Sequence, residues 1–319
     1  MKKLIVLILM LLSFFVCSGC EQSKDADIYI SVYPIEFIVK QIVKEELTVE
    51  SIYPRGAEVH DYEPTAKQIV SISECDVLFY IGLGLEPFIS NGLNSTFKDL
   101  KTVELSKYLE LVEMDGGHTH VGQGTNDSVN EEHDHEENEV YDSHVWLDPL
   151  AMVKMSQVIL EELVKIYPNY EETFTENQKV LEEELIKLNQ EYSDVISEHN
   201  VFDRIIMVDH DAYAYWTYRY GISRIKLRSD NESNEVGIQE FLTKVNQAKE
   251  AGIKHIISTK NETKSALFEN YLKELGATEK SLHHLGTITT QELKEGQNYL
   301  TIMRDNLEVL KEVLPREEN

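Results

Sequence analysis

The sequence has few cysteines, few positive charges and no long apolar run beyond its amino terminus. Three cysteines are too few for a disulfide framework, and Cys75, beside an apolar run, is predicted to be a buried small residue. The 30 Lys and Arg against 57 Asp and Glu give a formal net charge of −27, which repels phosphate backbones, argues against nucleic acid as a partner and attracts cations. No HExxH motif, the helical zinc site of metalloproteases, is present. Without disulfides, the stability of the protein must come from a packed core or a bound ligand.

The amino terminus has the regions of an export signal. Two lysines precede an uncharged apolar run over residues 4–16, which is shorter than the ~20 residues that span a bilayer, and small residues then lead to Cys20. The segment resembles a bacterial lipobox, in which the cysteine becomes the lipid-bearing first residue, although Cys17 stands where that motif usually has leucine. We predict a signal peptide over residues 1–19 and a lipid anchor on Cys20, with an ordinary cleaved signal peptide as the alternative.

Short apolar runs alternate with helical patterns along the rest of the chain. Such alternation predicts βαβ units with parallel sheets, here in two series. The predicted strands are residues 27–33, 47–53, 76–81 and 101–105, then 204–208, 223–227, 254–258 and 280–285. The predicted helices are residues 35–46, 64–74 and 85–94, then 211–220, 237–250, 263–275 and 296–313. We therefore expect an α/β protein of two lobes, each with a mostly parallel sheet flanked by helices, joined by a long linking helix.

The linking segment lies between the two series. Residues 150–166 and 169–198 have helical periodicity, and Pro168 interrupts them. A helix of about 30 residues is ~45 Å long, enough to run the length of two lobes and to limit hinge motion. A helix packed within one domain is the alternative. The predicted divisions are an amino-terminal lobe over 20–150, a linking segment over 151–200 and a carboxyl-terminal lobe over 201–319.

Residues 113–142 form a polar insertion in the first lobe that is rich in histidine. Four of the 11 histidines fall within this segment, as two His-x-His pairs. These residues are His118, His120, His133 and His135. Imidazole and carboxylate together bind borderline divalent metals, so we predict weak, exposed and exchangeable secondary metal sites here. A solvated low-complexity insertion is the alternative.

Three other histidines lie at predicted strand-to-helix loops, namely His60, His144 and His210. In parallel α/β sheets these loops share one edge of the sheet, where ligands bind. Histidines that are far apart in sequence can therefore converge there, and acidic neighbours can orient their rings. Each histidine taken singly is more often a cap or a loop residue, but together the three indicate a metal centre.

These motifs make the chain similar to the zinc- and manganese-binding solute-binding lipoproteins of bacterial ABC importers, the cluster A-I group. The similarity covers essentially the whole mature chain. It lies in GAEVHDYEPTAKQ at 56–68, GLGLEPF at 82–88, HVWLDP at 144–149, DHDAYAY at 209–215 and YLTIMRDNL at 299–307. The resemblance implies two lobes, a linking helix and one metal in the cleft, with His60, His144 and His210 as ligands. A histidine-rich loop ahead of the second ligand is typical of the zinc branch.

The fourth ligand position differs from the family pattern. That pattern has Asp or Glu near residues 280–286, where this chain has two histidines and a glycine. We predict His283 as the fourth ligand, because it aligns with one of the two usual acid positions and because alternating strand side chains would point His284 oppositely. His284, Glu58 or water are the alternatives. A site of four neutral imidazoles would favour Zn2+ over Mn2+.

The predicted function is that of a receptor on the outer face of the bacterial cytoplasmic membrane. It would bind Zn2+ with high affinity as a monomer and hand the ion to the membrane subunits of an ABC permease, without catalysis. Binding should weaken as pH falls through the histidine range, because protonated imidazole is not a ligand. The alternatives are a manganese-binding receptor or adhesin of the same family and a zinc hydrolase, since three histidines with an open position also occur in hydrolytic zinc sites.

Overall fold

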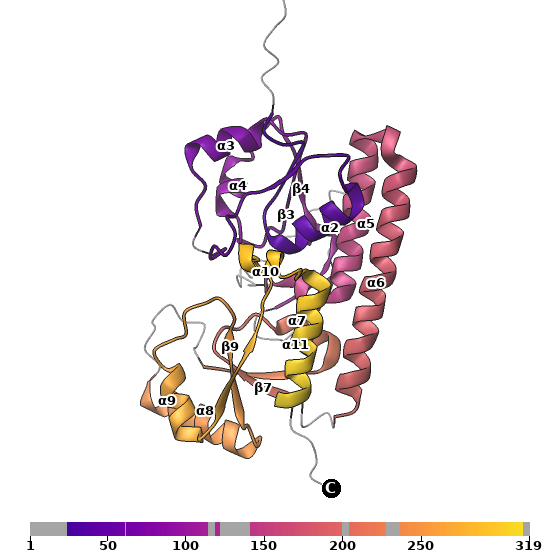
Figure 1. The fold of residues 1–319 in the computed structure, drawn as a ribbon. Helices are drawn as coiled ribbons and strands as arrows, with labels where there is room; N and C mark the ends of the chain where they lie inside the picture. Colours follow the sequence, from indigo (N-terminus) through magenta and orange to yellow (C-terminus); the bar gives the residue numbers. More distant parts are fainter. Residues whose placement is uncertain are drawn as a thin grey trace, which may run out of the picture.

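The computed structural model describes residues 24–60, 62–113, 119–121, 141–199, 204–227 and 237–314. It contains two parallel four-stranded sheets, each flanked by helices, and a pair of long helices beside them (Figure 1). The two-lobed α/β architecture predicted from the sequence is confirmed. Across the described ranges, no helix combines the length and the apolar character that crossing a membrane requires.

The amino-terminal sheet has the strand order β2-β1-β3-β4, with every pair parallel. Its strands are β1 (Ile28–Ile30), β2 (Val49–Ser51), β3 (Val77–Tyr80) and β4 (Lys101–Glu104), and its helices are α2 (Tyr33–Val43), α3 (Ala66–Ser73) and α4 (Pro87–Gly92). Every residue of β1 and β3 is buried, as expected for strands covered on both faces. Cys75, which precedes β3, is buried as predicted.

The carboxyl-terminal sheet has the order β10-β9-β7-β8 and is also fully parallel. Its strands are β7 (Ile205–Val208), β8 (Ser223–Lys226), β9 (His255–Thr259) and β10 (Thr278–Leu282). Its helices are α7 (Ala214–Tyr220), α8 (Ile238–Glu250), α9 (Phe268–Leu275), α10 (Thr290–Lys294) and α11 (Tyr299–Val313). The loops that follow β7, β9 and β10 leave from one edge of this sheet, because the three strands are parallel neighbours.

Helices α5 (Pro149–Ile166) and α6 (Glu171–Ser197) form the linking segment and lie side by side, and the longer α6 continues along the second lobe (Figure 1). Pro168 opens the short turn η3 (Pro168–Tyr170) between them, as its position in the sequence predicts. One face of α6 buries an apolar stripe that includes Leu185, Leu188 and Tyr192. Because α6 packs against α2 of the first lobe and α11 of the second, it holds the two lobes in one arrangement.

The largest apolar cluster extends through both lobes and the linking helices. Trp146, in the turn η2 (Val145–Leu147), has no exposed surface and donates from Nε1 to the carbonyl oxygen of His284 at 2.6 Å. The hydroxyl of Tyr299 donates to the carbonyl oxygen of Trp146 at 2.7 Å, and Nε1 of Trp216 donates to that of Leu147 at 2.9 Å. The floor between the lobes is therefore a packed, hydrogen-bonded core.

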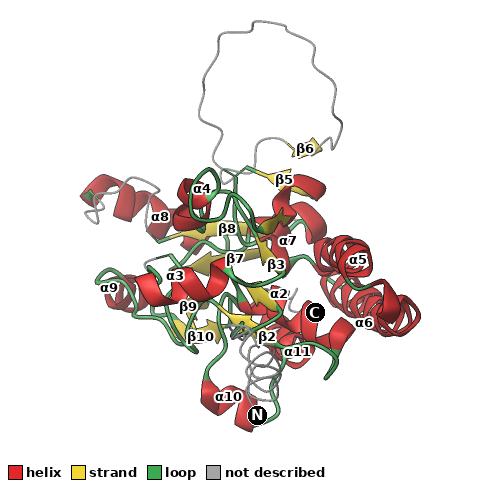
Figure 2. Cartoon of the chain, turned by 90° about the horizontal axis from the view of Figure 1, so that it is seen from above, coloured by secondary structure: helices red, strands yellow, loops and turns green. Residues whose placement is uncertain are grey.

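A small antiparallel ribbon lies at the base of the polar insertion. It pairs β5 (Glu110–Val112) with β6 (Thr119–Val121), and Figure 2 shows it at the periphery of the molecule. Glu113 bridges to Tyr141 where the chain returns. The expectation of a loop over 113–142 missed β6, because a three-residue strand in a polar segment has no periodicity to read. The turn η1 (Leu105–Tyr108) was likewise too short to predict.

Candidate metal site

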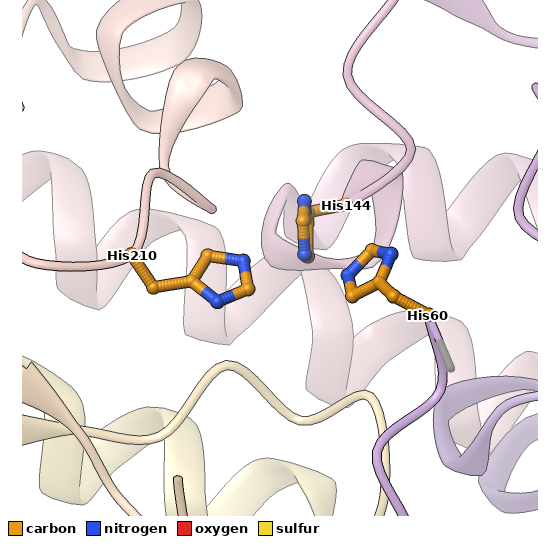
Figure 3. A group of neighbouring side chains, drawn as sticks. All are labelled: His60, His144 and His210. Carbon is orange, nitrogen blue, oxygen red and sulfur yellow. The ribbon is translucent and has the colours of Figure 1, made fainter. Parts of the chain in front are cut away.

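Three histidines converge between the lobes. His60 lies in the loop between β2 and α3, His144 directly precedes η2, and His210 follows β7. Each offers one ring nitrogen, and the three nitrogens lie within 4.8 Å of one another. Figure 3 shows the three rings pointing toward one another, with centroids 5.3–5.8 Å apart. The structure thus brings together the histidines that the sequence singled out, in an arrangement that can hold a metal ion.

His144 is oriented by a buried carboxylate two residues earlier. Oδ1 of Asp142 accepts the backbone N–H of His144 at 2.8 Å and lies 2.7 Å from its Nδ1. Burial alone would raise the pKa of Asp142, but the adjacent His144 holds that pKa below its usual value. An ionised carboxylate only accepts, so the imidazole proton lies on Nδ1. Nε2 of His144 is buried and, within the described part of the chain, has no hydrogen-bond partner, which leaves it for a metal.

His210 is oriented by a carboxylate from another loop. Oε2 of Glu262, three residues beyond the end of β9, lies 2.9 Å from Nδ1 of His210. Burial tends to raise the pKa of Glu262, but hydrogen bonds from His210 and His284 hold that pKa well below its usual value. Sequence reasoning missed Glu262. The signal was an acidic residue shortly after a predicted strand, at the sheet edge where the candidate ligands also lie.

His60 is the most exposed residue of the three, although its ring is directed into the group (Figure 3). Removal of the ring from water, together with the nearby His144 and His210, lowers the pKa of His60 to about 3. Its backbone N–H donates to Oε1 of Glu58 at 3.3 Å. The ring is therefore neutral at physiological pH and can offer a lone pair to a cation.

The segment after β10 differs from its prediction. The predicted strand runs to residue 285, but β10 ends at Leu282, so the alternation of strand side chains does not extend to the two histidines that follow. Both His283 and His284 line the same cavity, and the expectation that they would point oppositely is wrong. The His284 ring lies 5.6 Å from that of His210, whereas Nε2 of His283 lies 3.4 Å from Oε1 of Glu292. Coordination of a metal by His283 stays a prediction.

A cavity lined by His60 and His210, among others, has a volume of about 490 Å³ and takes residues from both lobes. Its walls include Gly56, Ala57 and Glu58 of the first lobe and Lys260, Glu262 and Thr287 of the second. Glu58, the alternative fourth ligand from the sequence, thus borders the space next to His60. A cavity of this size has room for a metal ion together with water.

Several predicted sites lie outside the described residues. Cys20, His118, His133 and His135 belong to this group, and of His120, in β6, only the backbone is described. The predicted lipid anchor and the predicted secondary metal sites therefore stay predictions.

Comparison with known proteins gives the family and agrees with the fold. A sequence model described as zinc-uptake complex component A, periplasmic, matches residues 28–313. The zinc-binding lipoprotein AdcA of Streptococcus pneumoniae is 28% identical over 322 residues, which cover 99% of this chain and 62% of AdcA. The high-affinity zinc uptake system protein ZnuA of Bacillus subtilis is 26% identical, with 93% of this chain and 90% of ZnuA covered.

A solved structure has the same fold. The crystal structure of the Zn(II)-bound ZnuA-like domain of Streptococcus pneumoniae AdcA has a TM-score of 0.72 and 25% identity, covering 91% of this chain and 99% of that domain. The chain spans less than two thirds of the length of full AdcA, whereas it spans nearly all of this domain.

Proposed function

Because the chain belongs to the family of periplasmic zinc-uptake complex components, we propose that it binds Zn2+ outside the cytoplasm and delivers the ion to an ABC permease. The observation that carries this proposal is the group of three histidine nitrogens within 4.8 Å of one another. Neutral imidazole suits Zn2+, whereas Mn2+ prefers carboxylate and water oxygens. AdcA and ZnuA are named as zinc-binding and zinc-uptake proteins, which supports the same choice of ion.

The proposed ligands are His60, His144 and His210, and the ion is cargo rather than a cofactor. The net charge of −27 attracts cations toward the protein. Imidazoles then replace part of the water around the ion, so capture needs no covalent step and the protein is not an enzyme. Water or Glu58 is proposed as the fourth ligand in place of His283, because Nε2 of His283 lies 3.4 Å from Oε1 of Glu292.

Competition titrations with a zinc chelator test the ligand assignment. We expect His60→Ala, His144→Ala and His210→Ala each to weaken zinc binding by about 100-fold or more, since each removes one directional metal bond. His255→Ala is the matched control. This histidine, at the start of β9, hydrogen-bonds Thr278 of β10 and does not line the cavity. A tight site that is unchanged in His144→Ala would contradict the proposal.

Thermal unfolding gives a second measurement on the intact chain. A ligand that binds only the native state at ~100 times its dissociation constant stabilises it by ~2.7 kcal/mol. Zinc should therefore raise the melting temperature of the parent protein, and Mn2+ at equal concentration should raise it less. A zinc hydrolase would instead show hydrolytic activity that a chelator abolishes.

Delivery to the permease is tested in cells that lack this receptor. We expect the parent chain to restore zinc uptake under chelation, and His144→Ala to fail although it is exported to the same level. Restoration by both chains would separate the transport function from the metal site.

The lipid anchor is a further part of the proposal. Cys20 lies in a lipobox-like segment, and the AdcA relative is named as a lipoprotein. One short acyl chain anchors a protein only marginally, whereas two hold it stably. Cys20→Ala should therefore be shed into the medium. Retention of that variant on membranes after a salt wash would contradict lipidation.

The histidine-rich insertion is proposed to hold weak, exchangeable zinc through His118, His120, His133 and His135. Deleting residues 116–138 should leave one tight site and remove additional weak ones in a calorimetric titration. Growth under zinc limitation should slow if the insertion speeds capture. Equal growth of the deleted and parent strains would indicate a passive insertion.

A further inference from the structure

In both His283 and His284, Nδ1 of the ring accepts a backbone N–H two residues further along the chain. Nδ1 of His283 accepts the backbone N–H of Leu285 at 2.9 Å, and Nδ1 of His284 accepts that of Gly286 at 3.0 Å. In a neutral imidazole the accepting nitrogen carries no proton, so the proton lies on Nε2. A protonated nitrogen has no lone pair for a metal. As the rings are placed, the protonated Nε2 lies 3.4 Å from Oε1 of Glu292 in His283 and 2.6 Å from Oε1 of Glu262 in His284.

The ring of His284 occupies space that a side chain at position 286 would fill. A Cβ atom on Gly286 would lie 2.8 Å from Cε1 of His284 and 3.0 Å from its Nδ1, which is too close for either atom to stay in place. The backbone here is fixed by the other lobe, because Tyr33 donates to the carbonyl oxygen of Gly286 and Trp146 donates to that of His284. Gly286 and these two hydrogen bonds therefore determine where the His284 ring lies.

Glu262 lies between two imidazoles. Nε2 of His284 is 2.6 Å from Oε1, and Nδ1 of His210 is 2.9 Å from Oε2. The rings of His210 and His284 are stacked, with 18° between their planes. The Glu262 side chain is only 15% exposed, so little water competes for its oxygens. One carboxylate thus hydrogen-bonds a proposed ligand through one oxygen and pairs with His284 through the other.

We infer that Glu262 and His284 form a positioning pair for His210 and do not supply the fourth metal ligand; this inference rests on the proposed zinc-binding function. Glu262 requires the proton of His210 on Nδ1, so Nε2 carries the lone pair that a metal ligand needs. Figure 3 shows one ring nitrogen of His210 directed toward His144 and the other away from it. His284 holds the second carboxylate oxygen and so prevents the carboxylate from turning into the cavity. A carboxylate behind a metal-binding histidine fixes its ring and raises its basicity.

Glu262→Gln tests the pair on the full chain. The amide offers one oxygen and one NH2 group, so it can accept from His210 or from His284 but not from both. We expect zinc affinity to fall by about 10- to 100-fold, the range known for such partners of metal ligands. Glu279→Gln is the matched control, because it removes a carboxylate of the same lobe that pairs with Lys264 and Ser258 outside the cavity.

Two readouts separate positioning from a purely structural role. Long-range proton–nitrogen NMR on the metal-free protein should show His210 protonated on Nδ1 and His284 on Nε2, and Glu262→Gln should give a mixture of His210 tautomers. The visible spectrum of the Co2+ complex reports coordination number. It should keep its intensity in Glu262→Gln at saturating Co2+, because the three histidine ligands remain.

A double-mutant comparison tests the role of Gly286. Gly286→Ala should displace the His284 ring and weaken zinc binding by about as much as His284→Ala, roughly 5- to 10-fold. In the His284→Ala background, Gly286→Ala should then have little further effect. Independent effects of the two substitutions would overturn the assigned role of Gly286. His284→Gln, whose amide can still donate to Glu262, should recover part of the affinity.

The outcomes distinguish this inference from the proposed function. If Glu262→Gln binds zinc within twofold of the parent and keeps the Nδ1 tautomer of His210, the positioning pair is wrong while the zinc receptor stands. If the Co2+ spectrum of Glu262→Gln loses intensity, Glu262 is a ligand and the positioning role is also wrong. If the parent protein does not bind zinc, the proposed function fails. The tautomers can then still be read in the metal-free protein.

Discussion

The two carboxylate–histidine pairs behind the candidate ligands are built differently. Asp142 orients His144 from two residues away, in a turn where the side chains are 1% and 5% exposed. Glu262 orients His210 from 52 residues away, at the cavity wall, where both side chains retain some exposure. The first pair belongs to the packed floor between the lobes, and its Oδ2 also accepts the N–H of Ala214. The second pair is assembled from two loops.

This difference separates stability from binding. A carboxylate sealed in the core depends on its imidazole partner, because an ionised group that loses its partner away from water is costly. A carboxylate at a cavity wall has water nearby and, in the case of Glu262, a second imidazole. The floor pair should therefore affect folding and binding together, whereas the wall pair should affect mainly binding.

The largest expected effect is on the metal-free stability of His144→Ala. Removal of the ring leaves Asp142 buried and without its main partner, which should cost about 3 kcal/mol of unfolding free energy. His210→Ala should cost less than about 1 kcal/mol, because Glu262 keeps its contact with His284. Urea unfolding in EDTA measures both variants against His255→Ala. Equal losses for the two would remove the distinction between floor and wall.

A third buried carboxylate, Glu86, sharpens the comparison, because its donors are backbone N–H groups rather than an imidazole. Glu86 accepts the backbone N–H groups of Ile81 and Gly82 at 3.1 and 2.9 Å, and burial raises the pKa of Glu86 to about 7. Between the unfolded value near 4.5 and this folded value, the native state binds more protons than the unfolded chain. Stability should therefore fall as pH rises from about 4.5 to 7, by on the order of 2 kcal/mol.

Glu86→Gln isolates this contribution. The amide does not titrate, so the difference in unfolding free energy between parent and variant should change by that amount across the same pH range. Parallel stability curves would show that Glu86 is ionised at neutral pH. Glu86 would then be ionised like Asp142, whose pKa is lowered beside His144, and the contrast between the two carboxylates would be lost.

A smaller effect is expected for Asp142→Asn. The amide oxygen can still accept from Nδ1 of His144, so the ring keeps its tautomer, while the charge behind it and the hydrogen bond from the N–H of Ala214 to Oδ2 are lost. Zinc affinity should fall by about tenfold, or about 1.4 kcal/mol, and by less than in Glu262→Gln, because the hydrogen bond to the ring of His144 is kept. Competition titration measures it beside Glu262→Gln. A larger loss in Asp142→Asn than in Glu262→Gln would reverse the order of the two pairs.

Much of this arrangement could be predicted from the sequence. Apolar runs alternating with helical periodicity indicate two parallel α/β lobes, and the position of Pro168 separates the two linking helices. His60, His144 and His210 stand out because each follows or precedes a predicted element at the edge where parallel strands end. Asp142 can also be predicted from the sequence, because it is an acidic residue only two positions before the candidate ligand His144.

The rest depends on contacts that a linear pattern does not contain. Glu262 becomes part of the site only because β9 lies between β7 and β10 in the sheet order. The end of β10 is three residues earlier than predicted, and this difference decides how the two following histidines are oriented. The need for glycine at position 286 is understood only from the structure, where the His284 ring occupies the space that a side chain would take.

The smallest expected effect is that of His283→Ala, and it decides between the sequence prediction and the side-chain geometry. Nδ1 of His283 accepts from Leu285 and Nε2 lies 3.4 Å from Oε1 of Glu292, so both nitrogens have neighbours other than the three histidines. We expect zinc affinity to change by less than about twofold, under about 0.5 kcal/mol. The same titration on His284→Ala should show a clear loss through Glu262. A loss of about 100-fold in His283→Ala, with His284→Ala unaffected, would instead establish the four-histidine site and require the segment after β10 to rearrange when zinc binds.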